Sequence, residues 1–372
     1  MRLAWKNILH DRVRFLATIV GIGFAVFLMV FQGSLLFGFS RAASKLVDVT
    51  DSDLWITARG VLCFDFSAPL SRRLMEIAES APGVERASRM VVSYAEYRSG
   101  DGKHHAVALI GADPDVGALF PIPYVAGARV ALEPDSVLID QSNADQLEVT
   151  VLPVDVEINK HRARVLRKVN GFSSFVGSPY VFTSYSNAVK YLGIRPEDSM
   201  YILLRLKPGY SPLAVKRFLQ ARLPEVDIWT HDEFSRQSRT YWLTQTGAGG
   251  GILVAAILGF LVGLVVVSQT MYATTMEHLE EFATLKALGA SKWFVVRIVL
   301  SQALICGVAG CLLGLLATFP VIDAARQVIP WIRTPGWLPA GVWIPTLLMC
   351  VIAANLSIRA ALKVEPARVF RA

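Results

Sequence analysis

Few residues in this chain of 372 have types and spacing that suit catalysis. His104 and His105 are adjacent and follow the turn-forming stretch 99–102. An Asp-Gly pair favours a tight hairpin, and neighbouring strand residues point to opposite faces, so these imidazoles are poorly placed to share one metal ion. A solvated hairpin is the better interpretation. Since the sequence also lacks GxSxG, HExxH and paired carboxylates in an apolar setting, we expect no enzyme, no catalytic residue and no metal site.

Nucleotide binding is not indicated either. The sequence contains no GxxxxGK[ST] loop, whose backbone would cradle phosphates. The glycine-rich stretch 247–251 precedes an apolar run and follows no strand, which favours a flexible joint over a phosphate-binding loop. We therefore expect no cofactor in this chain, and any ATP must be bound by another polypeptide.

Composition indicates an integral membrane protein with a sizeable polar part, because 53% of residues are hydrophobic and only 18% are charged. Four apolar segments approach the ~20 residues needed to cross a bilayer. They occupy residues 15–39, where a stalk also starts, 250–272, 297–321 and 339–358. The last segment is short and interrupted by Pro345.

Basic residues near the spans predict the orientation, because short loops rich in Lys and Arg stay in the cytoplasm. Such residues occur in the N-terminal stretch 1–14, in the loop 273–296 and in the tail 359–372. This multi-pass protein should therefore lie in the cell inner membrane with both termini in the cytoplasm. Residues 40–245 and the loop 322–338 should lie on the extracytoplasmic side. The net charge of +7 arises mostly from these basic residues near the spans, and it does not indicate nucleic-acid binding.

The N-terminal residues allow two interpretations. Leu3, Trp5, Ile8 and Leu9 alternate with basic residues, as in a helix lying at the membrane surface. A cleaved signal peptide is the alternative, but the apolar run exceeds the ~7 to 15 residues of a signal core. Cleavage would also leave the basic C-terminal tail on the wrong side, so an uncleaved first helix is favoured.

The region 40–245 has two similar ends, each with a strand, a helix, a Pro-x-Val turn and a second strand. The first end comprises strands near 53–57 and 88–98 around a helix at 71–80, and the second comprises strands at 201–206 and 227–229 around a helix that starts at Ser211. We predict two βαβ halves that form one split α/β lobe, with a β-rich lobe inserted at about 111–198. Stalk helices should extend the spans at 38–49 and 231–246.

A short charged helix precedes the third apolar segment. Glu280, Glu281 and Lys286 lie on one side of it, while Phe282, Leu285 and Leu288 recur at helical spacing on another. Gly289 provides a helix stop. The run from Lys286 to Ser291 resembles the intracellular loop of the FtsX/MacB/LolC superfamily of ABC-transporter permeases. In that superfamily a short coupling helix docks on the partner ATPase, and the resemblance places it at Glu280, Glu281, Phe282, Leu285, Lys286, Ala287, Leu288 and Gly289.

The resemblance implies the architecture and partners. It implies an α-helical membrane protein with four transmembrane helices and a large extracytoplasmic MacB-like α/β domain between helices 1 and 2. It also implies a second copy of the chain, a separate ABC ATPase in two copies, and transmission of motion from the ATPase to the outer domain. Gly259 with Gly263, and Gly310 with Gly314, form small-xxx-small faces that suit either this dimer or packing within one chain.

Stretches at 3–5, 14–16, 21–25, 31–33 and 52–56 are similar to the DevC branch, whose members work with a HlyD-like membrane-fusion adaptor and export glycolipid. The resemblance therefore favours export of a lipid, a glycolipid-like compound or another amphipathic substrate. Two other roles within the superfamily stay open. One is an FtsX-like scaffold that regulates an extracytoplasmic enzyme, and the other is a lipoprotein-releasing permease.

Overall fold

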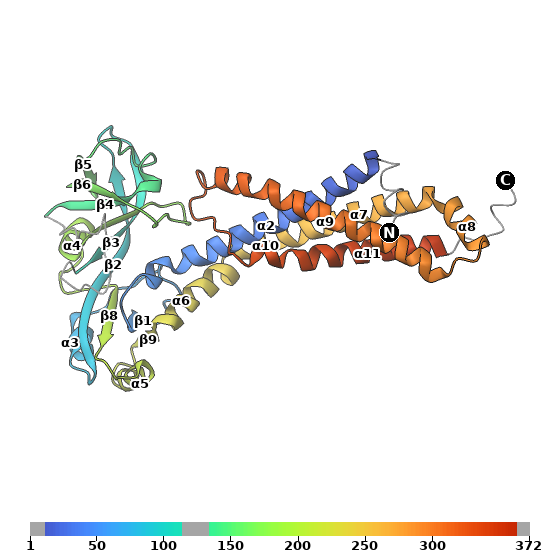
Figure 1. Ribbon diagram of the computed structural model, residues 1–372. Coiled ribbons are helices and arrows are strands. Elements are labelled where there is room, and N and C mark those ends of the chain that lie inside the picture. The colour runs from blue at the N-terminus through green and yellow to red at the C-terminus, as the bar shows by residue number, and fades with distance from the viewer. Residues whose placement is uncertain (1–11, 114–133, 363–372) are drawn as a thin grey trace. The chain divides into compact units, whose positions relative to one another are not determined.

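The computed structural model describes residues 12–113 and 134–362, which divide into two units. The helical unit comprises residues up to 38 and from 249 onward, and the α/β unit comprises residues 39–248. Figure 1 shows the elements of each. The division falls inside α2 (Arg12–Asp48), so this single helix belongs to both units. The predicted N-terminal interfacial helix and most of the C-terminal tail lie outside the described residues.

The helical unit contains four helices that are long and apolar enough to cross a membrane, counted over the described residues. They are α2, α7 (Ala248–Glu277), α9 (Lys292–Ala325) and the fourth candidate span, which combines α10 (Leu338–Gly341) with α11 (Trp343–Leu362). The short α8 (Leu279–Ala287) lies between α7 and α9 in the chain. The four predicted apolar segments thus correspond to helices.

The fourth segment is divided close to Pro345, because α10 ends at Gly341 and α11 begins at Trp343, but the proline itself lies inside α11. It is the third residue of α11, which has 20 residues and ends at Leu362. The first backbone N–H groups of a helix have no partner within it, so a proline at this position removes no hydrogen bond.

The glycine pairs pack against α2 of the same chain. All four glycines are buried. On α9, a Cβ atom added at Gly310 would lie 2.6 Å from Ile22 Cβ, and one added at Gly314 would lie 2.5 Å from the Gly23 carbonyl oxygen. On α7, a Cβ atom added at Gly259 would lie 3.1 Å from Leu28 Cβ, and one added at Gly263 would contact Ala25. The glycine spacing allows packing within one chain or packing between two copies. The contacts with α2 are packing within one chain.

The α/β unit is built on one sheet of nine strands among its described residues (Figure 1). The strands are β1 (Leu54–Ala58), β2 (Val84–Arg98), β3 (His104–Ala112), β4 (Ser136–Asp140), β5 (Val154–Ile158), β6 (His161–Val169), β7 (Tyr180–Ser184), β8 (Tyr201–Leu206) and β9 (Val226–Thr230). The helices are α3 (Arg72–Glu79), α4 (Tyr185–Leu192), α5 (Pro212–Arg222) and α6 (His231–Thr240), with a π-helical turn η2 (Tyr241–Gln245) and a 3₁₀ turn η1 (Gln141–Asn143).

The predicted strand-helix-strand halves are both present, and they interleave. The strand order at this end of the sheet is β2-β8-β1-β9, with every neighbouring pair antiparallel. Each half therefore places its two strands on either side of a strand from the other half. Buried residues of α3 and α5, such as Leu74 and Leu219, share one apolar core with Ile56 and Leu204 of the sheet.

The β-rich lobe is a closed ring of six strands. Its order is β3-β7-β4-β6-β5-β2, and β2 pairs again with β3 to close the ring. The 15-residue β2 serves both lobes, because its first half pairs with β8 and its second half, Met90–Arg98, pairs with β3. The lobe thus includes β3, most of which precedes the predicted start at residue 111.

The hairpin between β2 and β3 is the one predicted from the Asp-Gly turn, with His104 opposite Arg98. His104 Nδ1 lies 2.7 Å from Glu96 Oε1 on the exposed side. His105 is half-buried, and its ring centroid lies 6.4 Å from that of Tyr97. Among the described residues, no group of three or more His, Cys, Asp or Glu side chains has the geometry to hold a metal ion.

Candidate functional site

The segment between α7 and α9 is a short helix closed by a tight reversal. The Leu288 amide donates to the Thr284 carbonyl at 3.0 Å, and the Ala290 amide donates to the Leu285 carbonyl at 3.0 Å. This pair of bonds requires a left-handed residue between them, and Gly289 has a φ of +89°. Gly289 therefore ends α8 as the sequence predicts. Ser291 then caps α9 by accepting from the Phe294 amide.

The helix α8 is anchored by apolar residues on one face. Phe282 and Ala283 are 2% and 1% exposed, and Leu285 packs against the core of the helical unit. Glu280 and Glu281 are exposed on the other side. His278, which the sequence analysis did not single out, lies 3.1 Å from Glu281 and holds this carboxylate near the start of the helix.

Leu288 departs from the predicted apolar face. It is 81% exposed, because the chain reverses at Gly289 immediately after it. Trp293 at the start of α9 is 73% exposed, and Phe294 is 41% exposed. Exposed large apolar side chains near polar ones are typical of a surface that binds a protein or a membrane. We call Glu280, Glu281, Leu288 and Trp293 the α8 surface. Lys286 and Ala287 lie on α8, but their side chains are outside the described part of the structure.

A second group of functional candidates ties α2 to α6, the two predicted stalks. Asp48 Oδ1 accepts from the Ser235 hydroxyl at 2.6 Å, and Asp48 Oδ2 accepts from Arg239 Nη2 at 2.8 Å. Arg239 Nε also donates to the buried Ser44 hydroxyl at 2.6 Å. We call these four residues the stalk clamp. Charge-assisted bonds that are partly shielded from water hold geometry better than neutral ones, so within the α/β unit these two helical segments are joined firmly.

The helix α6 is also anchored on the sheet. Phe234 is fully buried, with its ring centroid 5.2 Å from that of Trp55 on β1 and 5.9 Å from that of Tyr201 on β8. Ser238 accepts a hydrogen bond from the Phe64 amide at 3.2 Å. A displacement of α6 would therefore act directly on the central strands β1 and β8.

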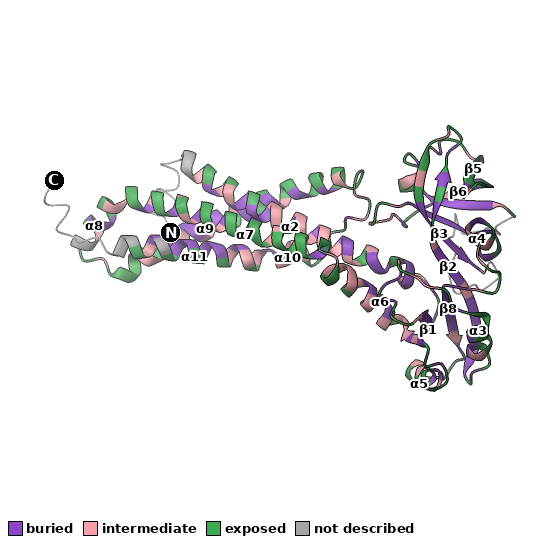
Figure 2. Cartoon of the chain, turned by 180° about the vertical axis from the view of Figure 1, so that it is seen from behind, coloured by how far each residue is buried: buried purple, intermediate pink, exposed green. Residues whose placement is uncertain are grey.

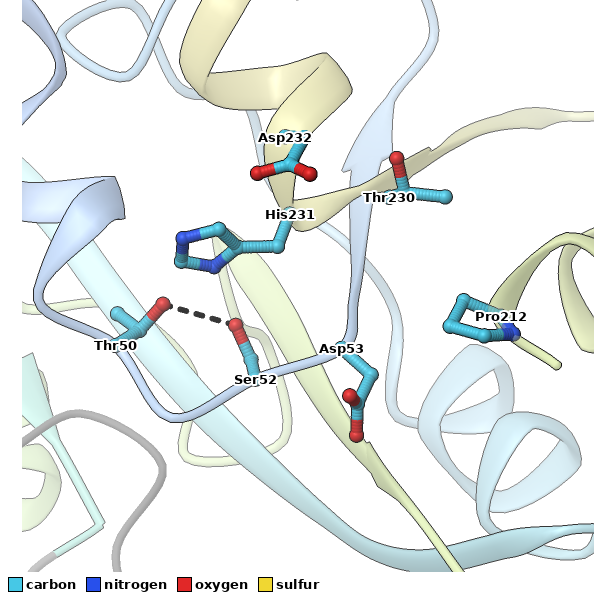
Figure 3. A pocket seen from close by; sticks show the side chains of 7 residues that line it. All are labelled: Thr50, Ser52, Asp53, Pro212, Thr230, His231 and Asp232. Atoms are coloured by element: carbon cyan, nitrogen blue, oxygen red, sulfur yellow. Dashed lines mark hydrogen bonds between the residues drawn. The ribbon is translucent and has the colours of Figure 1, made fainter. Parts of the chain in front are cut away.

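A polar hollow of about 330 Å³ lies where the chain leaves α2 and where α6 begins (Figure 3). Thr50, Ser52, Asp53, Pro212, Thr230, His231 and Asp232 line it. The Thr50 and Ser52 hydroxyls are 2.9 Å apart, and Thr230 caps α6 by accepting from the Glu233 amide. His231 Nδ1 is buried with no hydrogen-bond partner among the described residues. The hollow offers hydroxyl and carboxylate groups but no metal-binding set, and we assign it no ligand.

Asp65 is a carboxyl group of the α/β unit whose pKa is raised, whereas those of Glu148, Asp155 and Glu233 are lowered. Its carboxylate accepts from Trp242 Nε1 at 2.9 Å and from the Tyr180 hydroxyl at 3.5 Å. Burial raises the pKa of Asp65 to about 6, although the bond from Trp242 opposes the rise. Burial also raises the pKa of the neighbouring Cys63 thiol to about 11 and that of Tyr180 above its usual value, so both stay neutral where Asp65 titrates.

Acidification is expected to stabilise the α/β unit through Asp65. The folded chain takes up this proton near pH 6 and the unfolded chain near pH 3.8, so the stabilisation grows as the pH falls through 6 and is complete below 3.8. Between about pH 8 and about pH 5 it amounts to about 1 kcal/mol. Denaturant-dependent proteolysis of the full chain at both pH values would measure it. Asp65→Asn is the matched variant, since its side-chain oxygen can still accept from Trp242. An identical pH dependence in both proteins would assign the effect to other groups.

Two family models match the chain. The FtsX-like permease C-terminal model matches residues 253–366, and the MacB-like periplasmic core domain model matches residues 15–222. An ABC transporter permease of Mycobacterium bovis is 21% identical over 378 aligned residues, which cover 99% of this chain and 98% of the relative. An ABC transporter permease of Methanocaldococcus jannaschii is 28% identical over 128 residues, or 32% of each chain.

Two solved structures are similar to part of the chain. The periplasmic region of MacB from Actinobacillus actinomycetemcomitans has a TM-score of 0.37 and 13% identity, and the match covers 50% of this chain and 92% of that one. The extracellular domain of the ABC-type transporter YknZ from Gram-positive bacteria has a TM-score of 0.34 and 10% identity, with coverages of 48% and 98%.

The family follows from the extent of the matches. The MacB-like model alone spans more than half of the 372 residues, and the FtsX-like model contains the whole segment from α8 into α9. Four helices long enough to cross a membrane agree with a membrane protein, as counted in the described part of the chain. The chain therefore belongs to the ABC transporter permeases that combine a MacB-like periplasmic core domain with an FtsX-like C-terminal domain.

Proposed function

We propose that this chain is the membrane subunit that couples ATP hydrolysis, carried out by a separate ATPase, to movement of its α/β unit. The α8 surface is the observation that carries the proposal. It presents exposed acidic side chains on α8, which is anchored by buried Phe282 and Ala283, and exposed apolar side chains just after α8 and at the start of α9. A push on such a helix would move the core of the helical unit with it. The sequence has no P-loop, so ATP would be bound by the partner and this chain would need no cofactor.

The chain connectivity supports a route for the motion. The α8 surface directly follows α7, and α7 is preceded by η2 and α6. Within the α/β unit, α6 is joined to α2 by the stalk clamp and to the sheet by Phe234. A movement of α7 along its axis would therefore reach both the second stalk and the central strands. This mechanical role requires no passage of substrate between the spans.

We further propose two copies of the chain working with two ATPase subunits in the cytoplasmic membrane, with both termini inside. Figure 2 shows exposed positions recurring along α7 and α9, and many of these residues are large and apolar. They offer surface for lipid or for a second copy. The cargo would be lipid-like or otherwise amphipathic, and a HlyD-like adaptor would receive it. This finer assignment rests on the sequence stretches that are similar to the DevC branch.

The coupling role is tested by changing the α8 surface without touching its anchor. Glu280→Lys combined with Leu288→Asp reverses one exposed charge and removes one exposed apolar side chain. The matched control is Asp323→Lys with Val328→Asp, because Val328 is 83% exposed and the Asp323 side chain is 69% exposed near the other end of α9. We expect the first pair to reduce the ATPase recovered with the full chain from native membranes by about tenfold or more, equivalent to ~1.4 kcal/mol.

The control pair should retain the ATPase, and both variants should elute as single species in mild detergent. Mass spectrometry of the purified complexes identifies what stays bound. Equal ATPase recovery for the two pairs would contradict the coupling role. A wall hydrolase in place of an adaptor among the bound proteins would favour regulation over export.

A further inference from the structure

Three loop segments of the α/β unit are almost free of charge. They comprise residues 61–70, 170–179 and 241–247, the last of which includes the π-helical turn η2, and Asp65 is their single Asp, Glu, Lys or Arg. The chain as a whole is 18% charged, and β6 and α6, which directly precede two of these segments in the chain, each carry four charged residues. A surface segment exposed to water does not need to avoid charge, so this composition requires another explanation.

The aromatic side chains of these segments meet. The rings of Phe175 and Trp242 are 4.9 Å apart, those of Phe66 and Trp242 are 6.2 Å apart, and those of Phe66 and Tyr241 are 5.9 Å apart. Phe39 on α2 completes the group at 5.2 Å from Phe175. We call these five residues the aromatic seat.

The aromatic seat is only partly covered by the rest of the chain. Phe66 is 50% exposed, and the neighbouring Leu62 and Val176 are 40% and 37% exposed. The one carboxylate of the region, on Asp65, accepts hydrogen bonds from Trp242 and Tyr180 and does not add an unpaired charge to this surface. The exposed part of the seat is therefore apolar and aromatic, with a few hydroxyl and amide groups around it.

The position along the chain indicates what covers this surface. Trp242 lies shortly before α7, whose residues 248–276 include no Asp, Glu, Lys or Arg. At 1.5 Å per residue the ~30 Å hydrocarbon core takes up about 20 of these residues, and a core that begins at the start of α7 leaves the residues just before it in the headgroup layer. Trp242 and Tyr241 then lie at the level of the headgroups, where Trp and Tyr are enriched in membrane proteins.

We propose that the aromatic seat inserts into the headgroup layer of the leaflet on the side of the α/β unit, so that phospholipid is its binding partner. Phe66 and Val176 enter the lipid from two different loops, and Trp242 connects them to the helix that continues into the membrane. The seat would keep the loops 61–70 and 170–179 at the membrane surface even when no ATPase or adaptor is bound. This inference concerns a lipid contact and does not depend on the coupling role of α8.

Site-directed spin labelling of the full chain in phospholipid nanodiscs tests the proposal. Phe66→Cys and Val176→Cys carry the label in the seat, and Val151→Cys, at a residue that is 72% exposed in another loop, is the matched control. The four native cysteines are buried and should react slowly. We expect the seat labels to collide several-fold more with oxygen, relative to a water-soluble nickel complex, than the control label does.

Two seat positions keep the test decisive if one variant folds poorly. Oxygen-favoured collisions at either position, with nickel-favoured collisions at 151, support insertion into lipid. Nickel-favoured collisions at both seat positions would overturn the proposal, because both labels would then face water. No ATPase and no ATP is present in this measurement, so its outcome is independent of the test of α8.

Discussion

Replacing Gly314 with leucine is expected to prevent the helical unit from packing. A Cβ atom at this position would lie 2.5 Å from the Gly23 carbonyl oxygen and 2.7 Å from Val26 Cβ. The first contact is with backbone and cannot be relieved by a side-chain rotation, so α2 would have to move away from α9. Overpacking typically costs about 1–3 kcal/mol, and a clash with backbone belongs at the upper end of this range. Close helix approach at small residues also contributes to stability in membranes.

Gly251→Leu is the matched control, because no heavy atom lies within 4 Å of a Cβ added there in α7. The measurement is the fraction of each variant that remains a single species in mild detergent after heating, compared with the parent. Gly251→Leu should behave like the parent, whereas Gly314→Leu should aggregate at a much lower temperature or fail to be extracted. Equal heat resistance of the two variants would show that α2 and α9 can separate at little cost.

Local patterns in the sequence were sufficient for the elements themselves. Apolar runs predict the four long helices, because a span needs about 20 apolar residues whatever its neighbours are. Gly289 predicts the end of α8, because a left-handed residue is required there and glycine adopts it without strain. The strand-helix-strand halves of the α/β unit can also be predicted from the sequence, since each is contiguous in the chain.

Contacts between distant residues were not predictable. The interleaved order β2-β8-β1-β9 depends on pairing across more than 100 residues, and the six-stranded ring depends on pairing β3 with β7 and β2 with β5, which are also distant in the chain; no local pattern specifies either. The stalk clamp could not be predicted for the same reason, because Asp48 and Arg239 are far apart in the chain. The small-xxx-small spacing identifies Gly310 and Gly314 as a packing face, but the spacing is the same whether the partner is α2 or a second copy.

The candidate site shows the same division. Helical periodicity places Phe282 and Leu285 correctly toward the helical unit, but it also places Leu288 there. Leu288 is the residue at which helical geometry ends, so the period no longer describes its direction. Trp293 had no signal of its own, because an exposed tryptophan at the start of an apolar helix has the same sequence pattern as a buried one. The DevC branch, the adaptor and the cargo stay predictions from sequence similarity.

Phe234→Ala is expected to lower the free energy of unfolding of the α/β unit by about 3–5 kcal/mol, the usual cost of removing a buried aromatic ring. Phe234 is fully buried, and its ring lies among those of Trp55, Tyr201 and Trp229, with centroid distances of 5.2, 5.9 and 6.4 Å. The loss would be largest where α6 meets β1 and β8. Denaturant-dependent proteolysis of the full chain in detergent, scored by cleavage within residues 39–248, measures it.

Leu213→Ala on α5 is the matched control, because Leu213 is 54% exposed and its truncation should change stability by less than about 0.5 kcal/mol. The two variants also separate two steps of the proposed mechanism. Phe234→Ala leaves the α8 surface intact, so the full chain should still recover its ATPase while ATP no longer changes the protease sensitivity of the α/β unit. Glu280→Lys with Leu288→Asp should lose the ATPase itself. If Phe234→Ala kept the full response to ATP, the motion would have to reach the sheet by a route other than α6, and the stalk clamp on α2 would be the next position to change.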